Sequence, residues 1–209
     1  MIKIKKGLNI PIHGIPAGEI VDSKKSRSVA VLGNDYVGMK PTMLVEEGDL
    51  VKLGQPLFED KKNPGVMFTS PAGGRIESIN RGDRRVLQSI VIEVEQNEES
   101  LGFNSFTEDE LNQASPDDIR SQLISSGLWT AFRTRPYSKI PSVDSSPSNI
   151  FISALDTQPL SANPEDIINL KKDDFLFGIS VLKKLTNCQI HISVAEDSSL
   201  TLIDDEQLK

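Results

Sequence analysis

The sequence of 209 residues has few of the side chains that usually mark a catalytic or redox site, with one cysteine, two histidines and one tryptophan. A single cysteine excludes an internal disulfide framework and any iron–sulfur cluster that needs several thiolates from these residues. His13 and His191 lie far apart in the sequence, and neither has a neighbour at metal-ligand spacing. We therefore expect no metal site and no catalytic residue in this chain.

Long apolar segments are also missing. No stretch approaches the roughly 18 consecutive apolar residues of a membrane span, and charges stand near the N-terminus where a signal peptide is apolar. We expect a chain without a transmembrane segment that can still dock on a membrane component. The lysines at positions 3, 5 and 6 form a short run without interleaved aromatic residues, so nucleic acid is not an expected partner.

Charge is distributed unevenly within the net value of −7. Residues 1–97 carry 14 Lys and Arg against 12 Asp and Glu, whereas residues 98–209 carry 9 against 18. This shift predicts a boundary near residues 96–105, with an acidic linker at 96–100. We expect two domains, 1–100 and 101–209.

Two similar turns organise the first domain. Gly48-Asp49 and Gly82-Asp83 stand 34 positions apart, and each opens onto an apolar run of strand length. Gly-Asp turns of this kind join the strands of hairpins. After an extended arm we therefore expect a compact β unit with internal pseudo-symmetry and strands at 28–32, 42–45, 56–59, 66–69, 75–79 and 87–94.

Two related halves around Lys61-Lys62 resemble the biotinyl and lipoyl carrier domains. This resemblance implies a barrel-sandwich fold with a lysine at a hairpin tip that takes the cofactor. One alternative is thus a carrier domain modified on Lys61 or Lys62. The other, which we favour, is a solvated lysine pair, because Asn63-Pro64-Gly65 makes the tip longer and stiffer than a swinging arm requires.

The second domain has a different pattern. Thr107 and Glu110 form a capping box, and Ser115 precedes a helix predicted at 116–126 that stops at Gly127. A buried-type strand at 149–155, a helix capped by Asn163, a helical segment at 175–185 and a strand at 189–195 follow. Strands alternating with helices predict a Rossmann-like α/β domain with a largely parallel sheet, so the whole chain is α+β. The sheet has no final capping element, and we expect an incomplete domain in a fragment of a longer chain.

The run FEDKKNPGVMFTSPAGGRIESINRGDRRVLQSIVIEV at 58–94, with the opening residues 4–12, resembles the A subunit of the bacterial sodium-translocating NADH:quinone reductase (Na+-NQR). The resemblance extends over the entire chain. It implies a peripheral subunit on the cytoplasmic face of the bacterial inner membrane, in a respiratory complex that passes electrons from NADH to ubiquinone and transports Na+. The implied partners are the other subunits, including the membrane subunits, and ubiquinone.

The same resemblance implies that this chain holds no redox cofactor and is not catalytic alone, since NADH, flavins and the iron–sulfur cluster belong to partner subunits. The residues agree, because no Gly-x-Gly-x-x-Gly stands between a strand and a helix to cradle a pyrophosphate. Segment 127–137 carries bulky side chains in the corresponding place. A flavin-dependent dehydrogenase is a third alternative.

A quinone head group needs an apolar slot with one or two donors for its carbonyl oxygens. Segment 129–139 combines aromatic and cationic side chains, and the loop at 33–39 offers a second candidate wall. The predicted quinone-binding residues are Tyr36, Met39, Trp129, Phe132, Arg133, Tyr137 and Lys139. The alternative is that Trp129 and Phe132 only seal packed elements while the arginines face water.

Overall fold

The structure is a computed structural model, and it describes residues 26–195 together with 14, 16, 20, 198 and 200. The extended arm expected before the β unit lies mostly outside the described residues. Contacts divide the chain into two compact units. One consists of residues 23–146 and 184–186, and the other of 1–22, 147–183 and 187–209. The expected domain boundary at residues 100 and 101 stays a prediction.

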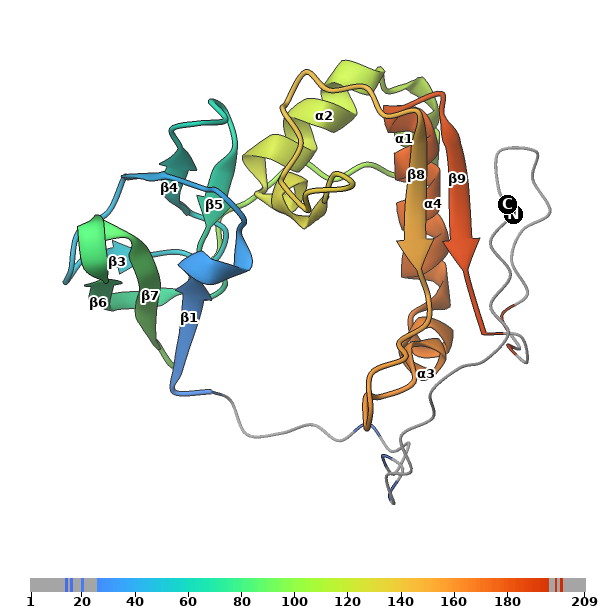
Figure 1. The fold of residues 1–209 in the computed structure, drawn as a ribbon. Coiled ribbons are helices and arrows are strands. Elements are labelled where there is room, and N and C mark those ends of the chain that lie inside the picture. The colour runs from blue at the N-terminus through green and yellow to red at the C-terminus, as the bar shows by residue number, and fades with distance from the viewer. Residues whose placement is uncertain are drawn as a thin grey trace. The chain divides into compact units, whose positions relative to one another are not determined.

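Seven strands in two antiparallel sheets form the β unit (Figure 1). One sheet has the order β1-β7-β6-β3 and the other the order β2-β4-β5. The strands are β1 (Ser28–Leu32), β2 (Pro41–Met43), β3 (Leu50–Val51), β4 (Pro56–Asp60), β5 (Met67–Thr69), β6 (Gly74–Arg81) and β7 (Leu87–Val94). The six predicted strands are therefore confirmed to within about two residues, and β3 was not predicted.

Buried apolar side chains from both sheets form the core. Phe58 and Phe68 stack with ring centroids 4.4 Å apart, and Ile76, Ile90 and Ile92 are almost fully buried. Alternate positions of a strand point to opposite faces, so Ile90 and Ile92 enter the core together. The Gly48-Asp49 turn leads into β3 and the Gly82-Asp83 turn leads toward β7, and both strands belong to the four-stranded sheet.

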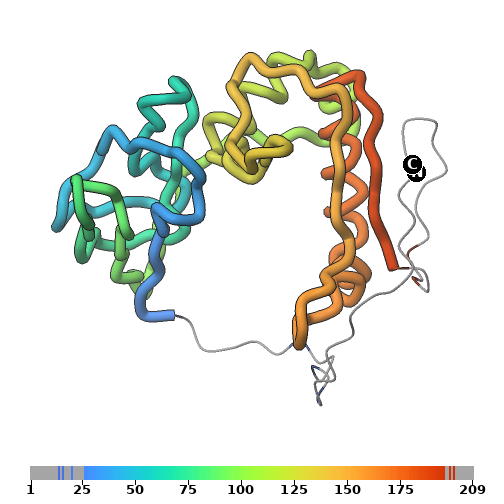
Figure 2. Tube along the Cα trace, in the orientation of Figure 1, coloured from blue at the N-terminus to red at the C-terminus, as the bar shows by residue number. Residues whose placement is uncertain are grey.

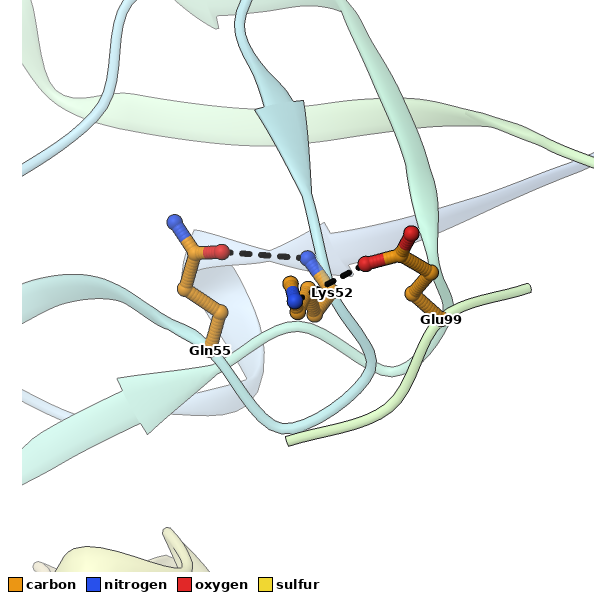
Figure 3. A network of polar contacts seen from close by, with 3 residues as sticks. All are labelled: Lys52, Gln55 and Glu99. Atoms are coloured by element: carbon orange, nitrogen blue, oxygen red, sulfur yellow. Dashed lines mark hydrogen bonds and ion pairs between the residues drawn. The ribbon is translucent and has the colours of Figure 1, made fainter. Parts of the chain in front are cut away.

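The acidic segment 96–100 is attached to the barrel instead of being a loose linker. The Leu53 amide donates to the Glu99 carbonyl and the Leu101 amide to the Leu53 carbonyl, both at 2.8 Å. Figure 3 shows Lys52 between two partners: its amide donates to Gln55 Oε1 at 3.1 Å, and its ammonium pairs with Glu99 at 2.8 Å. Composition alone predicted a linker because it does not reveal backbone pairing.

Two helices and one 3-10 turn in the same unit follow this segment: α1 (Glu108–Gln113), α2 (Pro116–Ser125) and η3 (Leu128–Ala131). The predicted cap at Thr107 is confirmed, since its hydroxyl and the Glu110 carboxylate satisfy each other's backbone amides. Ser115 caps α2 in the same way with Asp118. Figure 2 shows the chain after α2 beside the β4–β5 hairpin, where η3 contacts β5.

The other unit contains β8 (Asn149–Ser153), α3 (Pro164–Leu170), most of α4 (Lys172–Leu185) and β9 (Gln189–Ser193). β8 and β9 pair in parallel, as the β-α-β pattern predicted. The prediction that β8 is a buried-type strand was wrong, because Phe151 is 71% exposed while Ile150 and Ile152 on the opposite face are half-buried. Within the described residues β8 is covered on one face. The hydrophobicity of its sequence alone does not distinguish such a strand from one that is covered on both faces.

Candidate functional site

The first predicted wall of the site is the loop that follows β1. It begins with the 3-10 turn η1 (Gly33–Asp35), which places the half-buried Tyr36 edge-on against Phe68, with ring centroids 4.7 Å apart. Because Phe68 belongs to the barrel core, Tyr36 is fixed to a rigid element. Gly38 adopts φ +77°, a left-handed conformation that favours glycine, and returns the chain to β2.

The second predicted wall begins where α2 ends. Gly127, at φ +79°, terminates the helix as predicted and leads into η3. Trp129 of η3 is only 3% exposed, and its Nε1 donates to the Pro141 carbonyl at 3.0 Å. Phe132 lies edge-on to the indole with ring centroids 5.3 Å apart and remains half-buried. Trp129 therefore packs beneath this wall, while Phe132 reaches its surface.

Residues 134–139 form a turn that projects from the second wall. The Thr134 amide donates to the Lys139 carbonyl at 2.7 Å and closes the turn. Tyr137 lies within it and is 74% exposed. Its aromatic ring is thus displayed to solvent.

The structure brings the two walls together within one unit. The Arg133 guanidinium lies over the Tyr36 ring, 5.4 Å from its centroid. A Cβ atom built on Gly38 would lie 3.8 Å from Lys139 Cε, so the Lys139 side chain passes beside the first loop. Met39, half-buried, follows Gly38 and its amide donates to the Tyr36 carbonyl at 3.3 Å. Residues separated by about a hundred positions therefore share one surface.

Burial and charge act on Tyr36 in opposite directions. Desolvation raises the pKa of its hydroxyl above the ordinary value of 10.0, and this is the largest effect. The Arg133 guanidinium lowers the same pKa, while Asp35 raises it. The phenol is consequently protonated at neutral pH and can donate a hydrogen bond.

The hairpin tip between β4 and β5 is a part of the site that the sequence did not predict. Lys62 Nζ donates to the Gly38 carbonyl at 3.0 Å, beside the first wall. Asn63 Nδ2 donates to the carbonyls of Ile140 and Pro141, at 3.3 and 2.9 Å, beyond the second wall. The tip is therefore attached to the first wall and to the segment that directly follows the second wall. Its stiffness was expected from Pro64, but its contacts join segments that no local pattern relates.

A buried carboxylate supports this tip. Asp60, 7% exposed, accepts hydrogen bonds at Oδ1 from the amides of Lys40 and Lys62, both at 3.0 Å. Glu59 accepts one from the Gly65 amide at 2.7 Å. The acidic residues before the lysines thus organise the backbone of the tip.

The assembled site offers a phenol, a guanidinium, an ammonium and aromatic surfaces. These groups donate hydrogen bonds and contact planar rings, which suits a ligand with carbonyl oxygens on a flat head group. Among the described residues no cluster of His, Cys, Asp and Glu could hold a metal ion. In the same part of the chain, no helix is both long and apolar enough to cross a membrane.

Comparisons with known proteins agree with this architecture. Residues 2–95 match the family model of the NqrA N-terminal barrel-sandwich hybrid domain, and residues 114–209 match that of the NqrA second alpha/beta domain. The chain belongs to the NqrA family. The predicted barrel-sandwich followed by an α/β domain is confirmed.

Relatives of this NqrA-family chain are named as the A subunits of Na(+)-translocating NADH-quinone reductases. The protein of Yersinia pseudotuberculosis serotype O:1b is 55% identical over 201 residues, which are 96% of this chain and 45% of the relative. That of Histophilus somni strain 129Pt is 53% identical over 98% of this chain and 46% of its own length. The chain thus spans about half the length of the curated relatives it matches.

Proposed function

We propose that this chain is a peripheral subunit of a respiratory Na+-transporting NADH:ubiquinone oxidoreductase. In this proposal it contributes to the binding of ubiquinone and to the assembly of the complex, and it holds no redox cofactor of its own. The names of the NqrA-family relatives support the complex, since each is a subunit of a Na+-translocating NADH-quinone reductase. In this proposal the chain lies on the cytoplasmic face of the bacterial inner membrane, beside the membrane subunits. NADH, flavins and the iron–sulfur cluster belong to partner subunits.

The observation that carries the quinone role is the junction of the two walls at Tyr36 and Arg133. A quinone has two carbonyl oxygens that accept hydrogen bonds and a ring that packs on apolar or aromatic surface. The Tyr36 hydroxyl and the Lys139 ammonium have no hydrogen-bond partner among the described residues, so both are available as donors. Arg133 already donates to the carbonyls of Thr130 and Phe132, which fixes its position over Tyr36.

The remaining predicted residues take supporting roles. Met39 and Phe132, both half-buried, supply apolar surface beside the donors, and Tyr137 covers the head group from the projecting turn. Trp129 is too buried for direct contact and holds Phe132 in place from below. The chain's residues thus bind and orient the quinone, while the electrons come from partner subunits.

Titration of a short-tailed ubiquinone analogue tests this function. Phe132→Ala and Tyr137→Ala should each weaken binding by about fivefold, since a lost aromatic contact is worth on the order of 1 kcal/mol. Phe151→Ala is the matched control, because this exposed aromatic residue belongs to the other unit and should leave the affinity unchanged. Unchanged affinity in both test variants would refute the proposed site.

A carrier domain modified on Lys61 or Lys62 is the second candidate. Both lysines are exposed at the β4–β5 tip, the place where carrier domains hold their modified lysine. The hydrogen bond of Lys62 to Gly38 and the attachment of Asn63 argue against a swinging arm. We expect an intact mass equal to the bare sequence; added mass of a lipoyl or biotinyl group would favour the carrier.

A further inference from the structure

Six exposed cations surround the two walls of the candidate site. Their backbone and side-chain contacts keep them together: the Lys61 amide donates to the Lys40 carbonyl at 2.8 Å, and Lys62 and Lys139 both reach Gly38. The arginines lie over Tyr36 and in the projecting turn. We call this set the basic surface: Lys40, Lys61, Lys62, Arg133, Arg135 and Lys139.

Nearby carboxylates neutralise only part of this charge. Asp60 and Glu59 accept hydrogen bonds from backbone amides, which are neutral, so these two acids still offset two of the six cations. Asp35 and Asp144 are the other acids near these segments. The ion pairs of Lys52 with Glu99 and of Lys171 with Asp174 do not involve the basic surface. A positive surplus therefore persists on a chain whose net charge is −7.

Exposed apolar groups stand among these cations. Val37 is 54% exposed and Tyr137 is 74% exposed. Tyrosine is enriched at membrane–water interfaces, where its ring contacts the acyl boundary and its hydroxyl meets the head groups. Lysine side chains can extend along such a surface while their ammonium groups reach phosphates.

We propose that the basic surface docks on anionic phospholipid head groups, with Tyr137 and Val37 entering the interface. Clusters of four to eight Lys and Arg bind anionic leaflets, with about 1 kcal/mol from each cation, which is about fivefold in partition. A protein partner fits less well, because lysine is depleted at protein–protein interfaces and four of these six cations are lysines. The inference goes beyond quinone binding and does not depend on it.

Cosedimentation with vesicles tests the docking. The chain should bind vesicles of equal parts phosphatidylcholine and phosphatidylglycerol, and not vesicles of phosphatidylcholine alone. Binding should decrease with added salt, because salt screens charges beyond the Debye length of about 10 Å at 0.1 M. Absent binding, or equal binding to both vesicles, would overturn the proposal.

A triple variant locates the contact. Lys40→Ala, Lys61→Ala and Arg135→Ala together should reduce partition by about a hundredfold. The matched control removes three arginines from the β6–β7 turn of the same unit, with Arg81→Ala, Arg84→Ala and Arg85→Ala, and should retain binding. A larger loss in the control would place the contact at that turn and overturn the proposal. Should the triple variant not fold, the single variants Lys61→Ala and Arg135→Ala each test the fivefold effect.

Two further measurements separate the alternatives. Binding of polyglutamate but not of the anionic vesicles would identify the surface as a docking site for an acidic polypeptide and overturn the lipid proposal. The short-tailed quinone analogue, titrated without vesicles, should bind the triple variant normally, because none of its three positions belongs to the predicted quinone residues and the contacts of Lys62 and Asn63 that attach the tip remain. Failure of quinone binding alone would therefore leave the lipid result intact.

Discussion

Tyr36 is the residue whose environment can be measured most directly, because the sequence contains only two tyrosines. With Tyr137→Phe, Tyr36 is the only phenol, and its phenolate absorbance reports its own titration. We expect a pKa above 10.0, since burial disfavours the charged form. Arg133→Ala should raise this pKa further by removing the charge that lowers it.

The raised pKa of Tyr36 also makes the stability of the folded chain depend on pH. Folding keeps Tyr36 protonated at a pH where the unfolded chain loses this proton, so the stabilisation is complete below about pH 10 and is lost as the pH rises through the folded pKa. The same titration in concentrated urea should return the ordinary pKa. Equal midpoints with and without urea would contradict the packing of Tyr36 against Phe68.

Only some residues of the candidate site can be predicted from the sequence. Tyr36, Arg133 and Lys139 are predictable because their side-chain types suit a quinone, and the structure places them on one surface. The role of Asn63 is not predictable from sequence, because an amide in an Asn-Pro-Gly turn is ordinarily explained by the turn itself. Its hydrogen bonds to residues 140 and 141 are long-range contacts without a local pattern.

Among the structural elements, the β4–β5 tip and the segment after η3 depend on each other through Asn63. Asn63→Ala removes two hydrogen bonds and leaves two carbonyls without this donor, so unfolding free energy should fall by about 1–2 kcal/mol. This loss can be measured by urea unfolding monitored through tryptophan fluorescence, because Trp129 donates to the same Pro141 carbonyl. Asn80→Ala is the control, since the Asn80 amide bonds only exposed hydroxyls, and it should cost less than about 0.5 kcal/mol. Equal losses would contradict the attachment.

The capping box at the start of α2 gives a prediction that depends on pH. Ser115→Ala should reduce stability by about 1 kcal/mol, because it leaves the Asp118 amide without its acceptor. In the intact box, hydrogen bonds from the Ser115 hydroxyl and amide lower the pKa of Asp118 below 3.8. A lowered folded-state pKa contributes stability above the unfolded value, which is lost as pH falls through the folded pKa.

Urea unfolding of the wild type and of Ser115→Ala, at neutral and at strongly acidic pH, measures how much the cap contributes to the free energy of unfolding. The difference between wild type and Ser115→Ala should narrow at acidic pH, where Asp118 is protonated. Ser105→Ala serves as the control, because this exposed serine of the same unit lies outside the two capping boxes. A difference that does not change with pH would contradict the reciprocal cap.

Elements with strong local signals were predictable from sequence and the others were not. β7 and α2 combine an apolar period with defined ends, Gly82-Asp83 before the strand and Ser115-Pro116 at the helix. Segment 96–100 lacks any such period, and the barrel edge nevertheless captures it through backbone hydrogen bonds to Leu53. Non-local pairing of this kind depends on the tertiary fold rather than on side-chain pattern.

For the whole molecule, the two compact units have separate buried cores, with Ile76 in the barrel and Ile190 in β9. Chains with several cores commonly unfold in more than one transition. The single tryptophan, Trp129, belongs to the barrel unit, whereas far-ultraviolet circular dichroism also reports α3 and α4. Tryptophan fluorescence and circular dichroism should therefore report the unfolding of the two units separately.

Ile76→Ala and Ile190→Ala each remove a side chain that is almost completely buried, at a cost of about 2–5 kcal/mol. Ile76→Ala should lower the midpoint of the fluorescence transition. Ile190→Ala should lower the midpoint of helix loss in circular dichroism and leave the fluorescence midpoint in place, since distant sites act independently. If Ile190→Ala moved the fluorescence midpoint as far as Ile76→Ala does, the chain would unfold as one cooperative body, and the site on the barrel unit would depend on the α/β unit for its stability.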